Sequence, residues 1–316
     1  MNVKRRSDCP CPQHKLRSQQ FKGDTSLPFF SYGIFQPGEL AFLGIKQHVG
    51  SFYAGKITGK LLIRDGMPIL DTNEKNEQTR GFLLNFTPAF QKDAYAQIDA
   101  LEPENHYRWG TAMVSGQNAN VLYGKSPSKG SKVLDDAFWE GSKDPLFVEA
   151  IEVIDYTIRQ FGDQRYSAST DPIFNLFQLQ MAYLLLWSAI ERYVTFRYNM
   201  HGLAILRTIK KLATDETFVK SLARNVGRKA EVVRSDDPEK THKLDSTNPE
   251  KCIEYYYQLR CNITHRGKAF HDDYDLILSA LRELLRIFSE TKDSAFRESA
   301  EIRDTQAMRD VLQRPA

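Results

Sequence analysis

Residues 255–268, with the sequence YYYQLRCNITHRGK, divide the second half of the chain and decide how its fold is interpreted. The pattern before Arg260 is helical, and a leucine-rich amphipathic pattern begins near Asp272. A cation, an amide and an imidazole, from Arg260, Asn262 and His265, therefore lie at the junction between two predicted helices. Such a junction suits phosphate chemistry, because a guanidinium is a fixed fork of donors and an imidazole transfers protons near neutral pH.

The spacing of Arg260 and His265 leaves two interpretations open. Five residues correspond to a rotation of about 140° on an ideal helix, so the two side chains would not share a face. If a helix ended at Arg260, its long side chain would reach the imidazole of His265. From spacing alone we favour the simpler interpretation, in which both residues cap and solvate a helix end.

The pattern Arg-x-Asn-x-x-His-Arg-Gly-Lys between an aromatic and a leucine-rich helix resembles the HEPN family, particularly its ApeA-like branch, over roughly residues 144–290. The resemblance implies an all-α helical bundle and metal-independent cleavage of RNA. Arg260 and His265 match the two signature residues, and Asn262 would orient His265 or the substrate. Arg266 and Lys268 would bind flanking phosphates.

HEPN proteins usually pair so that two copies of the motif share one cleft. The resemblance therefore implies a homodimer through the helical domain. The apolar side chains of residues 173–196 and the Tyr255-Tyr256-Tyr257 run would supply the surface.

Composition sets limits on the partners. The chain has 316 residues, 41% of them hydrophobic, and a formal charge of +3. That near balance does not indicate a general polyanion binder, so contacts with RNA must come from local clusters. The four cysteines form no disulfide framework or zinc spacing, which fits a reducing cytoplasm. We expect no metal, no cofactor and no membrane contact, because the most apolar run, residues 181–190, is too short to cross a bilayer.

Short apolar segments with glycine turns characterise residues 28–123. They include Phe29-Phe30-Ser31, residues 57–63 and residues 81–86, and a short helix is predicted over residues 90–101. This pattern predicts a small barrel or strongly curved sheet. Within it, Tyr32-Gly33-Ile34-Phe35 is a strand running into a glycine loop, whose backbone N–H groups can hold an anion.

Further along, the segment Ile-Asp-Ala-Leu-Glu ends at Glu102 and is followed by Tyr107 and Arg108. Together with the Tyr32-Gly33 loop, this set resembles the gamma-glutamylcyclotransferase family over roughly residues 28–140. The resemblance implies a small mixed β-barrel whose loop, residues Tyr32 to Phe35, holds a gamma-glutamyl compound. It also implies that Tyr107 flanks the site and that Glu102 moves the proton as 5-oxoproline forms.

The sequence therefore predicts an α+β chain with four parts. These are a basic arm (residues 1–27), a gamma-glutamylcyclotransferase-like barrel (28–140), a HEPN-like all-α bundle (144–292) and a charged tail (293–316). Asp144-Pro145 and Asp171-Pro172 are expected to start helices, the second being the central helix of the bundle.

Three functions compete. The first is a HEPN-type endoribonuclease whose N-terminal domain senses or processes a gamma-glutamyl compound, by analogy in stress or phage defence. The second is a gamma-glutamyl cyclotransferase with a dimerising helical domain. The third is a non-catalytic regulator, because Cys261 and Pro103 depart from the two family patterns. The sequence favours the first by a small margin, since Arg260, Asn262 and His265 are all present.

Overall fold

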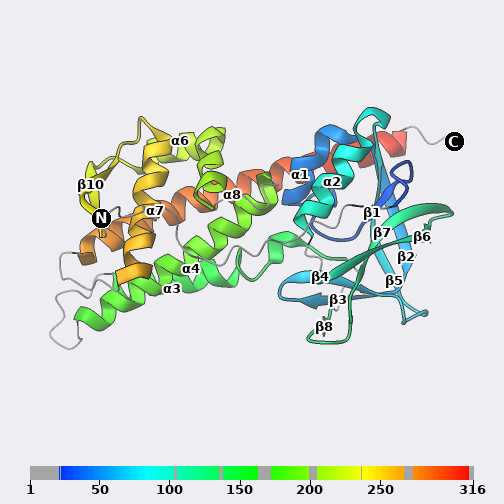
Figure 1. The fold of residues 1–316 in the computed structure, drawn as a ribbon, viewed down its shortest axis with the longest axis horizontal. Coiled ribbons are helices and arrows are strands. Elements are labelled where there is room, and N and C mark those ends of the chain that lie inside the picture. Colours follow the sequence, from blue (N-terminus) through cyan, green and yellow to red (C-terminus); the bar gives the residue numbers. More distant parts are fainter. Residues whose placement is uncertain are drawn as a thin grey trace, which may run out of the picture.

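The computed structural model describes residues 21, 23–102, 105–134, 138–162, 172–198, 205–235, 237–266 and 273–312, without the side chains of 172, 265, 266 and 307–312. The architecture is α+β, with sheets in the N-terminal half and helices in the C-terminal half (Figure 1). The predicted basic arm, residues 1–27, lies largely outside the described residues, as do Pro103, Gly267 and Lys268.

Two sheets form the N-terminal half. The larger has the order β2-β5-β1-β7-β6, in which β1 pairs antiparallel with β5 and parallel with β7. Its strands are β1 (Phe29–Ser31), β2 (Val49–Thr58), β5 (Gln78–Phe86), β6 (Tyr107–Val114) and β7 (Gln117–Gly124). The smaller sheet has the order β4-β3-β8, from β3 (Lys60–Arg64), β4 (Met67–Asp71) and β8 (Lys132–Val133).

The predicted barrel is not closed among the described strands. Of these strands, the edge strands β2 and β6 share no ladder; the Lys56 N–H donates to Ser115 Oγ, in the turn after β6, at 3.3 Å. The chain leaves the larger sheet at Gly59, whose φ of 143° suits glycine, and a Cβ there would lie 2.8 Å from the Asp71 carbonyl oxygen. This bend directs β3 into the second sheet, so the curved sheet stays open.

Helix α2 (Gln91–Leu101) matches the short helix predicted over residues 90–101, and it covers the N-terminal core. Tyr95, Ile98 and Leu101 are buried there, and the Tyr95 hydroxyl donates to the Leu27 carbonyl oxygen at 2.8 Å. Glu102 directly follows α2, so the packing of this helix fixes its position.

Five longer helices form the C-terminal half: α3 (Glu149–Phe161), α4 (Pro172–Tyr198), α6 (Glu216–Asn225), α7 (Pro249–Arg266) and α8 (Asp273–Leu312). The short α5 (Ile205–Ile209) precedes α6. Helix α4 begins at Pro172, as predicted, and its residues Tyr183, Leu186 and Ile190 are buried in the bundle core. Helix α3 begins at Glu149 rather than directly after Asp144-Pro145, because Asp144 closes a turn by accepting from the Leu146 N–H at 3.0 Å.

Helix α4 is the one described helix long and apolar enough to cross a membrane, and 56% of its apolar window is buried inside the protein. Its place at the centre of the bundle accounts for that composition.

Two predictions for the helical half are wrong. The half that was expected to be all-α contains strand β10 (Asp237–Leu244), which pairs antiparallel with β9 (Ala230–Arg234). Tyr255 and Tyr256 are buried and not on the surface. Both rings pack in the core of the helical bundle. The Tyr256 hydroxyl donates to Glu283 Oε2 at 3.0 Å.

Helices α1 (Leu40–Ile45) and α8 join the two halves. Leu40 and Leu43 belong to the core of the helical bundle, whereas Ala41, Phe42 and Ile45 belong to the N-terminal core. Helix α8 continues past residue 292, where a charged tail was expected to begin, and its far end reaches α1 and the sheets (Figure 1). The two halves are thus packed together along two helices.

We expect trypsin to cut first in the exposed segment around Lys129 and Lys132, where the side chains are solvent-accessible. The two fragments should stay associated in native gel filtration, because α1 contributes to both cores. Fragments that separate without denaturant would contradict this packing.

Candidate functional site

The first candidate site is the carboxyl of Glu102, a half-buried residue at the end of α2 whose Oε2 atom is buried. Glu102 caps the helix, and its N–H donates to the Ile98 carbonyl oxygen at 3.1 Å. Its Oε2 is buried and has no hydrogen-bond partner among the described residues. Burial raises the pKa of Glu102 from 4.5 to about 8, so this carboxyl exchanges its proton near neutral pH.

Two tyrosines that the sequence placed in this site lie close to Glu102 in the structure. The Tyr32 hydroxyl donates to the Leu122 carbonyl oxygen, and the Tyr107 hydroxyl donates to the Pro68 carbonyl oxygen at 2.7 Å. Burial raises the pKa of both phenols well above 10, and the nearby Glu102 carboxylate raises each pKa further. Both tyrosines therefore stay neutral, and Glu102 is the group of the three that titrates in the physiological range.

The glycine loop follows β1 and folds back on itself. The Gln36 N–H donates to the Gly33 carbonyl oxygen at 2.9 Å. Gly33 lies against β4, where a Cβ would come within 2.6 Å of Pro68 Cγ, so a larger residue would push the loop away from the sheet. The side chains of Ile34 and Phe35 fill the core, at 2% and 1% exposure. Only their backbone can serve a ligand, and no hydrogen bond within the described part of the chain uses either N–H.

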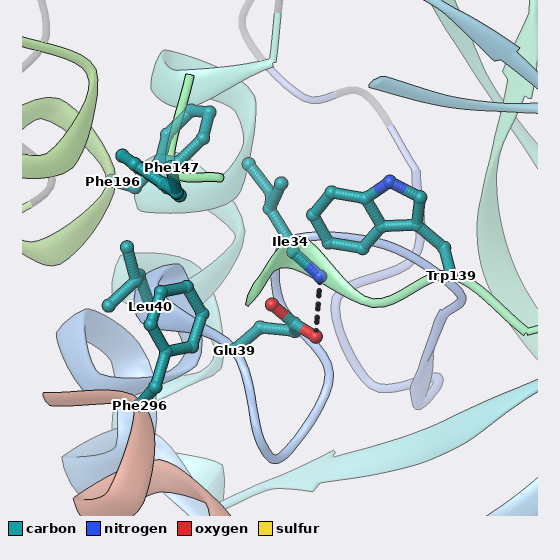
Figure 2. Close-up of a pocket in the computed structure, with 8 residues that line it drawn as sticks. Ile34, Glu39, Leu40, Trp139, Phe147, Phe196 and Phe296 are labelled. Atoms are coloured by element: carbon teal, nitrogen blue, oxygen red, sulfur yellow. Dashed lines mark hydrogen bonds between the residues drawn. The ribbon is translucent and has the colours of Figure 1, made fainter. Parts of the chain in front are cut away.

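A small apolar pocket lies beyond the loop, between the two halves (Figure 2). It is lined by Ile34 of the loop, by Glu39, by Trp139 and by Phe296, which is on α8. The Gly141 N–H donates to Glu39 Oε1 at 3.0 Å, and burial raises the pKa of this carboxyl well above its usual range. Sequence reasoning missed Glu39, because a glutamate directly before a helix is indistinguishable from an exposed first-turn acid.

The second candidate site is on α7, which runs unbroken from Pro249 to Arg266. The helix does not end at Arg260, so the hypothesis that the chain leaves the helix there is wrong. On one continuous helix, backbone positions 260 and 265 are rotated about 140° apart around the helix axis. The side chains of His265 and Arg266 lie outside the described residues.

The described side chains of the second site have structural partners. Arg260 Nη2 lies 3.4 Å from Glu191 Oε1 of α4, and its guanidinium stacks 5.6 Å from the centre of the Tyr257 ring. Asn262 Nδ2 donates to the Val233 carbonyl oxygen at 2.8 Å, and its Oδ1 accepts from the Ser235 N–H at 3.2 Å. Asn262 therefore fastens the β9–β10 hairpin to α7.

Arg192, the residue after Glu191, is a further charged residue in α4 with partners outside its helix. Arg192 pairs with buried Asp144 at 2.7 Å and donates to the Asp65 carbonyl oxygen at 3.3 Å. A Glu-Arg pair inside a helix that is otherwise apolar indicates that both side chains have partners, since unpaired buried charges are costly. Across the described residues, no three His, Cys, Asp or Glu side chains gather where they could hold a metal.

Comparison with known proteins does not assign a family. The chain matches no family model, no curated protein and no solved structure with which it was compared. The geometry of the two sites is therefore the basis on which a function can be proposed.

The raised pKa of Glu102 makes a prediction about stability. Between pH 4.5 and about 8 the folded state holds a proton that the unfolded state loses, so stability contributed by Glu102 falls as pH rises through this window. Glu102→Gln removes this dependence. We expect the free energy of unfolding of Glu102→Gln, relative to that of wild type, to increase from about pH 5 to pH 9, by on the order of 4 kcal/mol.

Urea denaturation across this pH range measures the effect, with exposed Glu74→Gln as the control for loss of a surface charge. A difference between wild type and Glu102→Gln that does not change with pH would show that this carboxyl is not buried in solution.

Proposed function

We propose that the N-terminal half binds a gamma-glutamyl compound and that Glu102 is its proton carrier. The observation that carries the proposal is the buried Oε2 of Glu102, which has no hydrogen-bond partner among the described residues. This carboxyl lies beside Tyr32 and Tyr107 and has a pKa of about 8. A general base works best when its pKa is near the working pH. The sequence favoured ribonuclease activity, but the described geometry gives more support to the N-terminal site.

The chemistry assigns one task to each part. The loop N–H groups of Ile34 and Phe35 would hold the α-carboxylate of the gamma-glutamyl group. Glu102 would take a proton from the α-ammonium, and the freed amine would attack the γ-carbonyl carbon. The new C–N bond closes the lactam ring, the old γ C–N bond breaks, and the proton held by Glu102 goes to the leaving nitrogen. The attacking nitrogen then gives its remaining excess proton to the Glu102 carboxylate, which passes it to the amine product. The products are 5-oxoproline and a free amine.

We also propose that the two N-terminal sheets correspond to the small barrel of the gamma-glutamylcyclotransferase family. The edges β2 and β6 approach at Gly55, where a Cβ would lie 3.2 Å from Val114 Cγ1. Loop, helix α2 and Glu102 keep the order along the chain that the resemblance implies.

Glu102→Gln keeps the shape of the side chain and removes the proton carrier. With a panel of gamma-glutamyl amines, we expect the variant to release 5-oxoproline about 10²-fold more slowly or worse. Wild-type kcat/KM should rise with pH up to about 8, where the carboxylate becomes the main form. Glu74→Gln, which changes the same charge on an exposed loop, should match wild type. Wild-type protein that releases no 5-oxoproline would leave this half without the proposed chemistry.

Ribonuclease activity is the second candidate, and the environment of Arg260 favours it. The guanidinium is partly exposed and stacks on Tyr257, and among the described residues it has one long ion pair, with Glu191. A guanidinium has five N–H donors, so this arrangement leaves donors for a phosphate. His265 would then transfer the proton of the RNA 2′-hydroxyl, Arg266 and Lys268 would bind flanking phosphates, and no metal would be needed.

A homodimer would compensate for the divergence of Arg260 and His265 along α7. Six large apolar side chains on α3 and α4 are exposed, between 44% and 64%: Val153, Tyr156, Ile173, Phe174, Phe177 and Met181. On α4 they follow helical spacing, and the same stripe continues through Ser188 to Glu191, the partner of Arg260. We propose that a second copy covers this face and so brings two motifs together.

The ribonuclease proposal predicts cleavage of single-stranded RNA in EDTA, with 2′,3′-cyclic phosphate ends and a dimer by light scattering. His265→Ala and Arg260→Ala should abolish cleavage, while Arg286→Ala, an exposed arginine on α8, should not. Glu191→Gln separates the ion pair of Arg260 from its proposed binding of phosphate, because this change removes the ion pair and keeps the guanidinium. Cleavage that survives His265→Ala, or that disappears in Glu191→Gln, would contradict this assignment.

A further inference from the structure

The loop of the first candidate site is held by a residue from the other end of the chain. Ser299, on α8, is fully buried. Its Oγ accepts from the Gly38 N–H at 3.0 Å and donates to the Glu39 carbonyl oxygen at 2.9 Å. One hydroxyl thus bridges two consecutive residues of the loop, and both its acceptor and donor capacity are used.

The loop cannot make these bonds by itself. Its internal hydrogen bonds run from the Gln36 N–H to the Gly33 carbonyl oxygen and from the Glu39 N–H to the Gln36 carbonyl oxygen, at 2.9 and 3.0 Å. Gly38 sits between them with a φ of 106°, a conformation that only glycine adopts readily. Within the described chain, Ser299 is the acceptor for its N–H.

Ionic contacts fix α8 at this position. Glu298, the residue before Ser299, pairs with Lys46 at 2.5 Å and with Arg197 of α4 at 3.0 Å. Arg303, one turn later, places Nη1 3.0 Å from where a Gly38 Cβ would lie. Phe296, one turn earlier, lines the pocket beside Glu39 (Figure 2). Three successive turns of α8 therefore touch the loop or the helix that follows it.

We propose that Ser299 is a positioning residue for the N-terminal site, so that the helical half fixes the loop of a site formed by the N-terminal half. The inference rests on the proposed binding of a gamma-glutamyl compound by this loop. Ser299 touches no reacting atom; it acts by fixing residues 33–39 so that their N–H groups keep one direction. Because binding equilibria are reciprocal, a ligand that orders the loop also stabilises the docking of α8.

The first arm of the test needs no ligand. Hydrogen–deuterium exchange on the full chain compares wild type with Ser299→Ala, Ser299→Thr and Ser294→Ala. Ser294 is the matched control, because it lies on α8 but its Oγ bonds Thr217 inside the helical half at 3.0 Å. We expect about tenfold faster exchange over residues 33–40 in Ser299→Ala, recovery in Ser299→Thr and no change in Ser294→Ala. Loop exchange that stays at the wild-type rate in Ser299→Ala would overturn the inference.

The second arm separates positioning from chemistry. With gamma-glutamylalanine as the probe, Ser299→Ala should raise KM for 5-oxoproline release about tenfold and leave kcat within about twofold, and Ser299→Thr should restore KM. A loss of kcat with an unchanged KM would overturn the positioning role. If wild type neither binds nor converts any gamma-glutamyl amine, the proposed function fails, whereas the exchange arm still decides whether Ser299 sets the loop.

Discussion

The division of one short helix between two cores is the constraint on which the rest of the structure depends. Leu40 and Leu43 of α1 pack into the helical bundle, while Ala41, Phe42 and Ile45 pack into the N-terminal core. Each buried leucine contributes roughly 1.5–3 kcal/mol of transfer free energy, so neither core can release α1 without a large loss. The loop before α1 is therefore fixed at its end by both halves, and α8 reaches back along the same junction (Figure 1).

Glu102 shows how a carboxyl oxygen can stay buried with no hydrogen-bond partner among the described residues. An unpaired buried polar group is costly, and rigid surroundings are required to keep it in place. Glu102 follows the packed helix α2, and its neighbours Tyr32 and Tyr107 use their hydroxyls on backbone carbonyl oxygens of Leu122 and Pro68. The two tyrosine hydroxyls therefore donate to the backbone and not to the Glu102 carboxyl. A group kept in this state is available for proton transfer, which is the physical basis of the proposed function.

Some features were predictable because they are local. The Asp171-Pro172 helix start, the buried face of α2 and the grouping of Glu102, Tyr32 and Tyr107 all follow from short-range pattern or from a resemblance over one domain. Other features depend on distant contacts. The sequence of strand β10 is as polar as that of a loop. Its hairpin with β9 is held by Asn262, which donates to the carbonyl oxygen of Val233 in β9 and accepts from the N–H of Ser235 in the turn after β9. The end of α8 reads as a charged tail, because the buried residues Ala295 and Ser299 are small and the loop partners of Ser299 lie some 260 positions away.

The central claim is that Glu102 is a buried carboxyl poised near neutral pH, and a direct titration tests it. Carbon-13 NMR of protein labelled at glutamate side-chain carboxyls, compared with Glu102→Gln to assign the signal, gives the midpoint of this one group. We predict a midpoint near 8. A Glu102 signal that titrates near 4.5, as an exposed glutamate does, would contradict the claim.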